Sequence, residues 1–438
     1  MKSASAMIDI TPPIGISICG NVRDDDLARG THDPLLCNAV LMESEETSVL
    51  FLVLDWVGVD EAEATILRKR AGAVVGILKK NVVVSATHTH SGPKIITRSG
   101  FDYRNDEEEK YLNKAFDDIV EGVKSLPGEL EEVSLWGAVS DIEGHNFCRR
   151  LRMADGKVVM NWIEVDPTDV VCATGDPDKQ MSVVGMKRAD NTWQTLMVNF
   201  TLHAAICVGR DWLWSADYVN YLRERIWEAL PEKPVVHFSN GAEGDVNALD
   251  YENFNLEAFP EAQRYGRELA DHAMEILGDA EQMSDKLNCV TGAVAMYRRE
   301  ITQEWSQWAK AKWEACGGEI PQLLHGIPSE YYAHAIINME QFAGEKDIYP
   351  MTAVRVGDIA AVTLPGEIFS QIGLNIKDKS PFDKTFMLGL SQGYCGYIPD
   401  KKAFAEGGYE QRTGRGSRYE VDSCDKIESV AQNLLELL

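Results

Sequence analysis

Apolar residues recur along the chain with two different spacings. Six short, almost continuous apolar runs are typical of strands; they are Ser48–Leu54, Val82–Ala86, Thr195–Phe200, Pro234–Phe238, Ile359–Leu364 and Thr385–Leu390. Three segments, residues 109–125, 218–230 and 259–277, repeat apolar residues at the spacing of one helical face. Strand runs that alternate with amphipathic helices predict an α/β fold.

One segment departs from this alternation. Residues from about 300 to 345 have few strand signals and are rich in aromatic residues, namely Trp305, Trp308, Trp313, Tyr331, Tyr332 and Phe342. We interpret the segment as a helical insertion. Two roles stay open for it at this point: a packed helical pair, or a lid over a pocket.

Polar residues cluster where five of the apolar runs end. The clusters are Thr87–Pro93 (Thr-His-Thr-His-Ser-Gly-Pro), His203, residues 239–247 (Ser-Asn-Gly-Ala-Glu-Gly-Asp-Val-Asn), Pro365–Glu367 and residues 389–394. Open α/β sheets bind ligands beyond the carboxyl ends of their strands. We therefore expect these clusters to converge on one site.

Two histidines and a glutamate in these clusters suggest metal chemistry. Alternate residues of an extended chain point to the same side, so His88 and His90 can face one pocket, one as a ligand and one as an acid/base. Each residue also has a plainer interpretation. The histidine pair suits a turn before Pro93, His203 suits a core position, and Glu367 suits the first turn of a helix that it opens. Together, two His and one Glu form a ligand set of zinc hydrolases.

A serine hydrolase is excluded on two grounds. Residues 389–393 match the pattern Gly-x-Ser-x-Gly, but the following residues, Tyr394–Pro399, cannot form the regular helix that this motif opens. The mechanism also needs a later histidine, and the last one is His334.

Taken together, the motifs resemble the neutral/alkaline, non-lysosomal ceramidase family, and more closely its short bacterial homologues. They occur in the family's order, and they are Asp9–Pro13, His32–Leu35, Thr87–Pro93, Arg149-Arg150, Asn199–Ala204, Ser215–Tyr218, Gly244–Asn247, Leu364–Glu367 and Tyr394–Tyr397. The resemblance implies one catalytic domain over residues 1–438, with mixed β-sheets flanked by helices and the helical insertion at about 300–345. It implies no C-terminal immunoglobulin-like domain.

The resemblance also implies a zinc site and its surroundings. The family's zinc ligands fall on His88, His203, Glu367 and Tyr397. Tyr409 stands where the family has a tyrosine that positions the substrate. Either Arg149 or Arg150 matches an arginine that holds the substrate.

Three further residues are expected to act on the substrate or the attacking water. His90 would carry a proton to the leaving group, because the pKa of an imidazole suits that role. Asp245 and Asn247 would orient the water or the substrate. The loop that holds Arg412, Arg415 and Arg418 is either solvated or recognises an anionic substrate.

Two departures from the family affect the expected substrate. The family has a serine after Gly-Asp-Val, whereas Asn247 follows Gly244–Val246 here. We also expect no immunoglobulin-like domain of the kind that the ceramidases add at the C-terminus. We therefore expect zinc-activated water to attack an amide or ester carbonyl of a small soluble substrate, not ceramide. The alternatives are a zinc-dependent lyase or isomerase acting on a sugar-like metabolite, and a non-catalytic binding protein.

The composition limits the kinds of partner that the protein can bind. The 438 residues include 43 Lys and Arg and 69 Asp and Glu, a formal charge of −26. Such a polyanion suits neither nucleic acid nor anionic lipid, and no apolar run approaches the length of a membrane span. The nine cysteines are scattered, without Cys-x-x-Cys, and residues 1–15 lack the apolar stretch that a signal peptide would have. We expect a cytoplasmic protein whose partner is a small molecule, and leave homo-oligomerisation open.

Overall fold

The computed structural model describes residues 1–20, 26–97, 103–163, 165–253, 257–320 and 328–438. Within these residues the largest sheet has nine strands. In spatial order eight of them are β14 (Val235–Asn240), β12 (Trp193–Phe200), β11 (Gln180–Arg188), β6 (Glu131–Asp141), β1 (Lys2–Asp9), β3 (Leu36–Glu43), β4 (Ser48–Leu54) and β5 (Val82–Ala86), and β16 (Glu281–Gln282) pairs with β6. The sheet is mixed, because β12–β14 and β4–β5 pair in parallel and the other pairs are antiparallel.

A second sheet of four strands lies against the first. Its order is β17 (Leu287–Tyr297), β18 (Lys346–Val356), β19 (Ile359–Thr363) and β21 (Thr385–Leu388). The smaller sheets are β10 (Val170–Ala173) with β8 (Arg150–Met153) and β9 (Val158–Met160), β2 (Gly30–Thr31) with β13 (Leu213–Trp214), β7 (Phe147–Cys148) with β15 (Val246–Asn247), and β20 (Glu367–Ile368) with β22 (Tyr397–Ile398).

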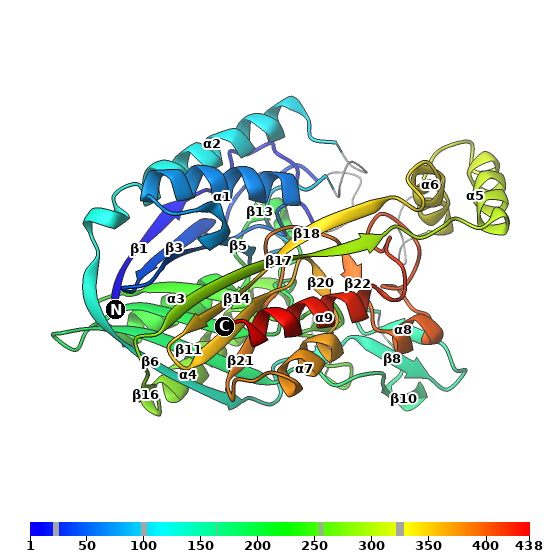
Figure 1. Ribbon diagram of the computed structural model, residues 1–438. Coiled ribbons are helices and arrows are strands. Elements are labelled where there is room, and N and C mark those ends of the chain that lie inside the picture. Colours follow the sequence, from blue (N-terminus) through cyan, green and yellow to red (C-terminus); the bar gives the residue numbers. More distant parts are fainter. Residues whose placement is uncertain (21–25, 98–102, 164, 254–256, 321–327) are drawn as a thin grey trace.

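The helices of the described residues are α1 (Glu61–Val75), α2 (Asp106–Val123), α3 (Tyr218–Ala229), α4 (Ala258–Gly278), α5 (Gln303–Ala315), α6 (Ser329–Glu340), α7 (Ser370–Asp378), α8 (Lys401–Glu406) and α9 (Ser423–Glu436). Most of them cover the outer faces of the two sheets, whereas α5 and α6 lie together beyond one end of β17 and β18 (Figure 1). α1 and α2 pack on the half of the large sheet near β4, and α3 and α4 pack on the half near β12. α7 and α9 pack on the second sheet. The predicted α/β fold of mixed sheets flanked by helices is confirmed.

The continuous apolar runs have a direct structural reason. Along β4, Leu50, Leu52 and Leu54 pack towards α1 and α2, whereas Val49 and Phe51 pack into the apolar layer between the two sheets. A strand with a core on both faces must be apolar at every position. This is why the sequence predicts β4 and β5 with the bounds that the structure has.

Glu367 corrects one prediction. The sequence predicts that Glu367 opens a helix, but it lies in β20, and α7 begins three residues later at Ser370. Parallel pairing with β22 holds it extended, since the Glu367 backbone N–H donates to the Gly396 carbonyl at 3.0 Å. That partner lies 29 residues further along the chain, where local sequence reasoning could not find it.

The predicted insertion holds α5 and α6, which follow β17 and precede β18. The two helices pack on each other through a small apolar cluster that includes Ala309, Ala333 and Ile336. Residues 321–327 lie outside the described part of the chain. Among the described residues, no helix combines the length and the apolar character needed to cross a bilayer.

His237 in β14 is expected to make the fold sensitive to acid. Burial lowers the pKa of this imidazole to about 3, whereas a histidine of the unfolded chain titrates near 6.5. Between these values the unfolded state binds one proton more, so stability is lost as the pH falls, by about 1.4 kcal/mol per unit. In His237→Gln the free energy of unfolding, measured in urea at pH 6.5, 5.5 and 4.5, should fall less steeply by that amount. An unchanged slope would contradict a neutral, buried His237.

Candidate metal centre and substrate cavity

Two histidines lie just beyond the carboxyl ends of β5 and β12. Nδ1 of His88 is 2.5 Å from the Val57 carbonyl oxygen, and Nδ1 of His203 is 3.0 Å from the Glu243 carbonyl oxygen. A carbonyl oxygen only accepts hydrogen bonds, so each Nδ1 donates, which leaves Nε2 as the ring nitrogen that can offer a lone pair to a metal ion. Burial, with contributions from His88 and Arg149, lowers the pKa of His203 to about 3, which keeps this ring neutral.

The Nε2 atoms of the two histidines lie close to each other and to one carboxylate oxygen of Glu367. They are 3.0 Å apart, and Glu367 Oε2 is 3.5 Å from the Nε2 of His88 and 3.3 Å from that of His203. Two lone pairs cannot hydrogen-bond to each other, and a cation held between the two nitrogens would turn this repulsive contact into a favourable one. All three side chains are buried, and Glu367 Oε2 has no hydrogen-bond partner among the described residues.

Glu243 completes this cluster, and the sequence analysis gave it no role. Its carboxylate comes within 4.8 Å of the ligand atoms of His88, His203 and Glu367. The side chain is fully buried, and neither oxygen has a hydrogen-bond partner in the described part of the chain. Burial and the charge of Glu367 raise its pKa well above the usual value. In the sequence, Glu243 is marked as a candidate only by its place in the polar segment 239–247. The residues predicted from that segment to act at the site are Asp245 and Asn247.

These donors fit a metal ion. Buried carboxylate oxygens without hydrogen-bond donors, here Glu367 Oε2 and both oxygens of Glu243, are costly, and a divalent cation would offset that cost. Two imidazoles and two carboxylates are donors that zinc accepts, and the second ring nitrogen of each histidine is already held by a carbonyl, as in metal-bound histidines. The cluster could therefore hold a metal ion.

Tyr397, which the resemblance gives as the fourth ligand, lies beside Glu367 because the two residues are opposite each other in the β20–β22 pair. Its ring is 5.2 Å from the Arg149 guanidinium and 5.7 Å from the Tyr409 ring. The hydroxyl that donates to Glu367 Oε1, however, belongs to Tyr394. The ligand role of Tyr397 stays a prediction.

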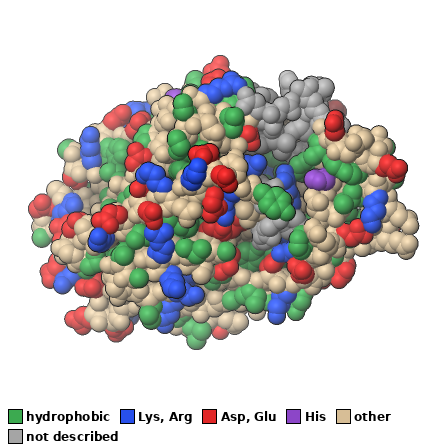
Figure 2. Space-filling view, turned by 90° about the horizontal axis from the view of Figure 1, so that it is seen from above, with side chains coloured by type: hydrophobic (Ala, Val, Ile, Leu, Met, Phe, Trp, Pro, Cys, Tyr) green, Lys and Arg blue, Asp and Glu red, His purple; other side chains and the backbone are tan. Residues whose placement is uncertain are grey.

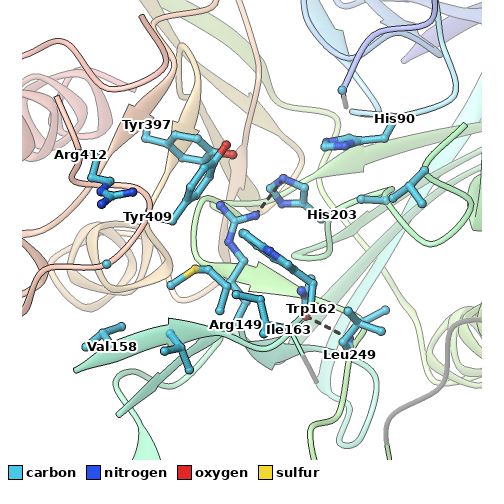
Figure 3. A pocket seen from close by; sticks show the side chains of 18 of the residues that line it. His90, Arg149, Val158, Trp162, Ile163, His203, Leu249, Tyr397, Tyr409 and Arg412 are labelled. Atoms are coloured by element: carbon cyan, nitrogen blue, oxygen red, sulfur yellow. Dashed lines mark hydrogen bonds between the residues drawn. The ribbon is translucent and has the colours of Figure 1, made fainter. Parts of the chain in front are cut away.

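A cavity of about 960 Å³ reaches this cluster. His90 and His203 line one end, and Tyr397 and Tyr409 line it on the side of β22 (Figure 3). Further lining residues are Val158, Met160, Trp162, Ile163, Leu249 and, from α6, Tyr332. The helical insertion therefore contributes to the cavity wall. Nε2 of His90 is 3.3 Å from that of His88, and burial lowers the pKa of His90 well below its usual range.

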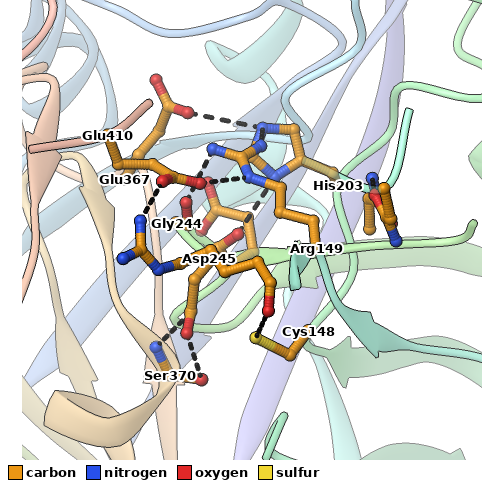
Figure 4. Close-up of polar contacts among 12 residues, drawn as sticks. Cys148, Arg149, His203, Gly244, Asp245, Glu367, Ser370 and Glu410 are labelled. Atoms are coloured by element: carbon orange, nitrogen blue, oxygen red, sulfur yellow. Dashed lines mark hydrogen bonds and ion pairs between the residues drawn. The ribbon is translucent and has the colours of Figure 1, made fainter. Parts of the chain in front are cut away.

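The structure separates the two adjacent arginines. Arg149 lines the cavity, with Nη1 3.3 Å from His203 Nε2, Nη2 donating to the Gly244 carbonyl at 2.8 Å and Nε donating to Glu410 at 2.8 Å. Figure 4 shows this guanidinium between His203 and Glu410. Arg150 instead donates to the other Glu410 oxygen at 2.5 Å and to the Gly407 carbonyl at 2.6 Å, and is not among the residues that line the cavity.

Asp245 and Asn247 are occupied by structural contacts. The Asp245 carboxylate accepts from the backbone N–H of Ser370 at 2.8 Å and from its hydroxyl at 3.2 Å, which ties it to the start of α7. Burial raises its pKa to about 6. It is not among the residues that line the cavity. Asn247 does line the cavity, but its amide is paired with that of Asn161 at 2.7 and 2.9 Å.

Two solved structures that resemble the chain are ceramidases. The neutral ceramidase from Pseudomonas aeruginosa matches with a TM-score of 0.75 and 18% identity, over 100% of this chain and 75% of that one. A ceramidase complexed with C2 matches with a TM-score of 0.73 and 16% identity, over 99% of this chain and 74% of that one. No protein-family model and no curated protein matches the sequence. The chain thus has a neutral ceramidase-like fold, as its motifs predict.

Proposed function

We propose that the protein is a zinc-dependent hydrolase that cleaves an amide or ester bond of a small, soluble substrate rather than ceramide. The observation that carries the proposal is the convergence of His88 Nε2, His203 Nε2 and Glu367 Oε2, the last without a hydrogen-bond partner among the described residues, at the end of a large cavity. The ceramidase-like fold supports hydrolysis as the class of reaction.

His88 Nε2, His203 Nε2 and Glu367 Oε2 would hold the zinc, with Glu243 or Tyr397 completing the set. When bound, zinc supplies Lewis-acid chemistry, which polarises a carbonyl and makes water a nucleophile near neutral pH. Tyr394 orients the Glu367 carboxylate through its hydroxyl. The Val57 and Glu243 carbonyls fix the ring orientation of the two histidines.

His90 and Arg149 perform the remaining chemistry. The neutral His90 ring faces the cavity beside the ligands, so its Nε2 can take a proton and return it to the leaving nitrogen or oxygen. Arg149 is held by Glu410 and the Gly244 carbonyl, and presents a fixed positive charge to the cavity. A positive charge fixed before the reaction stabilises the oxyanion that forms on the attacked carbonyl.

Metal analysis and product analysis test the proposal together. Purified protein is expected to contain about one zinc per chain and, with a panel of N-acyl amides and esters in ¹⁸O-labelled water, to release acids that carry the label. Protein without bound metal would overturn the zinc assignment. Turnover without incorporation of the label would favour the lyase or isomerase alternative, because only hydrolysis must take up oxygen from water.

A further inference from the structure

The charges on the cavity wall differ from those of the whole molecule. The chain has a net charge of −26, yet the described lining residues include four cations, Arg149, Lys157, Arg210 and Arg412, and two carboxylates, Glu261 and Glu406. Figure 2 shows Lys or Arg side chains inside a hollow of the surface, next to hydrophobic ones.

Both carboxylates are neutralised by arginines that are not among the lining residues. Glu261 pairs with Arg264 at 2.5 Å, and Glu406 pairs with Arg152 at 2.6 Å. These acids therefore leave little negative charge to cancel the cations of the cavity.

Two of the four cations are also matched by acids. Arg149 pairs with Glu410 at 2.8 Å, and Lys157 pairs with Asp155 at 2.6 Å. Arg210 and Arg412 have no carboxylate partner among the residues that the structure describes, and both guanidinium groups are exposed to solvent. Arg412 lies over the Tyr332 ring at 4.5 Å and points into the cavity from the side of Tyr409 (Figure 3). Among the described lining residues, Arg210 and Arg412 are therefore the two cations without a carboxylate partner.

The other two arginines of this loop, Arg415 and Arg418, are bound to tyrosine hydroxyls. Arg415 donates to the Tyr331 hydroxyl at 2.7 Å, and Arg418 is fully buried, where it donates to the Tyr349 hydroxyl at 3.0 Å. Of the three arginines of this loop, Arg412 alone is among the described residues that line the cavity.

We propose that the substrate is an amphipathic anion: an amide or ester with an apolar part and a carboxylate or phosphate group that Arg412 binds, with Arg210 adding a second positive charge to the cavity wall. The inference rests on the proposed function, since it describes a substrate of the same site. Val158, Met160, Trp162, Ile163 and Leu249 supply the apolar wall against which the uncharged part packs. Guanidinium groups bind carboxylates and phosphates through charge-assisted, often bidentate, hydrogen bonds.

Three probes of one acyl length test the charge requirement. They are N-hexanoylglycine, a carboxylate; N-hexanoyl-O-phosphoethanolamine, a phosphate; and N-hexanoylglycinamide, which is neutral. Titration calorimetry on the zinc-loaded protein measures affinity, and chromatography measures turnover. We expect at least one anion to bind about tenfold or more tightly than the neutral probe, and the stronger of the two identifies the anionic group.

Variants then assign the preference to the two arginines. The double variant Arg210→Gln, Arg412→Gln should lose about tenfold in affinity for the preferred anion and less than twofold for the neutral probe. Arg412→Lys should retain part of the preference. Arg267→Gln serves as the matched control, because Arg267 is an exposed arginine of α4 that pairs with Glu228 outside the cavity.

The outcomes separate this inference from the proposed function. Equal affinity for charged and neutral probes, or an equal loss on all three in the double variant, would overturn the anionic substrate even if hydrolysis is observed. A preference for the anion that depends on Arg412 and Arg210 in a protein that cleaves no probe would support the anion site and count against the hydrolase. No binding of either anion at millimolar concentration would also overturn the inference.

Discussion

Replacing Glu367 with alanine is expected to abolish stoichiometric zinc binding and to lower the hydrolysis rate at least about a thousandfold. Glu367 Oε2 is the oxygen that both histidine Nε2 atoms face, at 3.3 and 3.5 Å, so its loss opens the ligand set on one side. Without a metal to activate water, only binding and general acid–base catalysis remain. Zinc content by mass spectrometry and initial rates on a cleavable amide measure the two effects. His88→Ala should behave in the same way.

Stability separates a lost ligand from a lost fold. In metal-free protein, replacing the buried Glu367 loses the hydrogen bond that Tyr394 donates to Oε1, about 1–3 kcal/mol, but also removes the unpartnered Oε2, so the fold should persist. Zinc should raise the melting temperature of the wild type, because it binds only the folded state, and should leave that of Glu367→Ala unchanged. A variant that still binds one zinc with unchanged affinity would show that Glu367 is not a ligand.

In the same experiment, Glu243→Gln tests whether zinc binding is weakened rather than abolished. If Glu243 completes the set, its amide should weaken zinc binding about 10- to 100-fold without abolishing it, as expected for a weakened member of a ligand shell. Unchanged affinity would leave the remaining position to Tyr397, which Tyr397→Phe tests directly.

Arg149→Met is expected to lower kcat about 100- to 1,000-fold while zinc content stays near one per chain. The guanidinium is the fixed cation beside the cluster, and removal of one donor to a developing oxyanion commonly has an effect of this size. Glu410 keeps its ion pair with Arg150 in this variant, so no isolated charge is buried. A kcat within threefold of the wild type would remove Arg149 from oxyanion stabilisation.

Arg150→Met is the matched control, since both residues pair with Glu410 and only Arg149 lines the cavity. Glu410 keeps its ion pair with Arg149 in this variant, so Arg150→Met also buries no isolated charge and should fold. Arg150→Met should retain a far larger share of the wild-type kcat than Arg149→Met does. Urea unfolding and initial rates measure the two quantities separately.

The sequence by itself determined the framework and the centre of the candidate site. Strands such as β4 and β5 could be read from it because a strand with apolar contacts on both faces carries a continuous apolar run. The convergence of His88, His203 and Glu367 was predictable because each follows an apolar run directly, and their motifs occur in the order of one family.

The tertiary structure decided which neighbour of each candidate faces the cavity. Arg149 and Arg150 are adjacent and of the same type, and what separates them is Glu410, about 260 residues away, and the cavity on one side. In the same way Ser370 engages Asp245, while Glu243 is left without a hydrogen-bond donor in the described part of the chain. Arg412 differs from Arg415 and Arg418 in the partners that α6 and β18 present. Side-chain direction and charge compensation depend on contacts between distant segments, and local sequence patterns do not encode them.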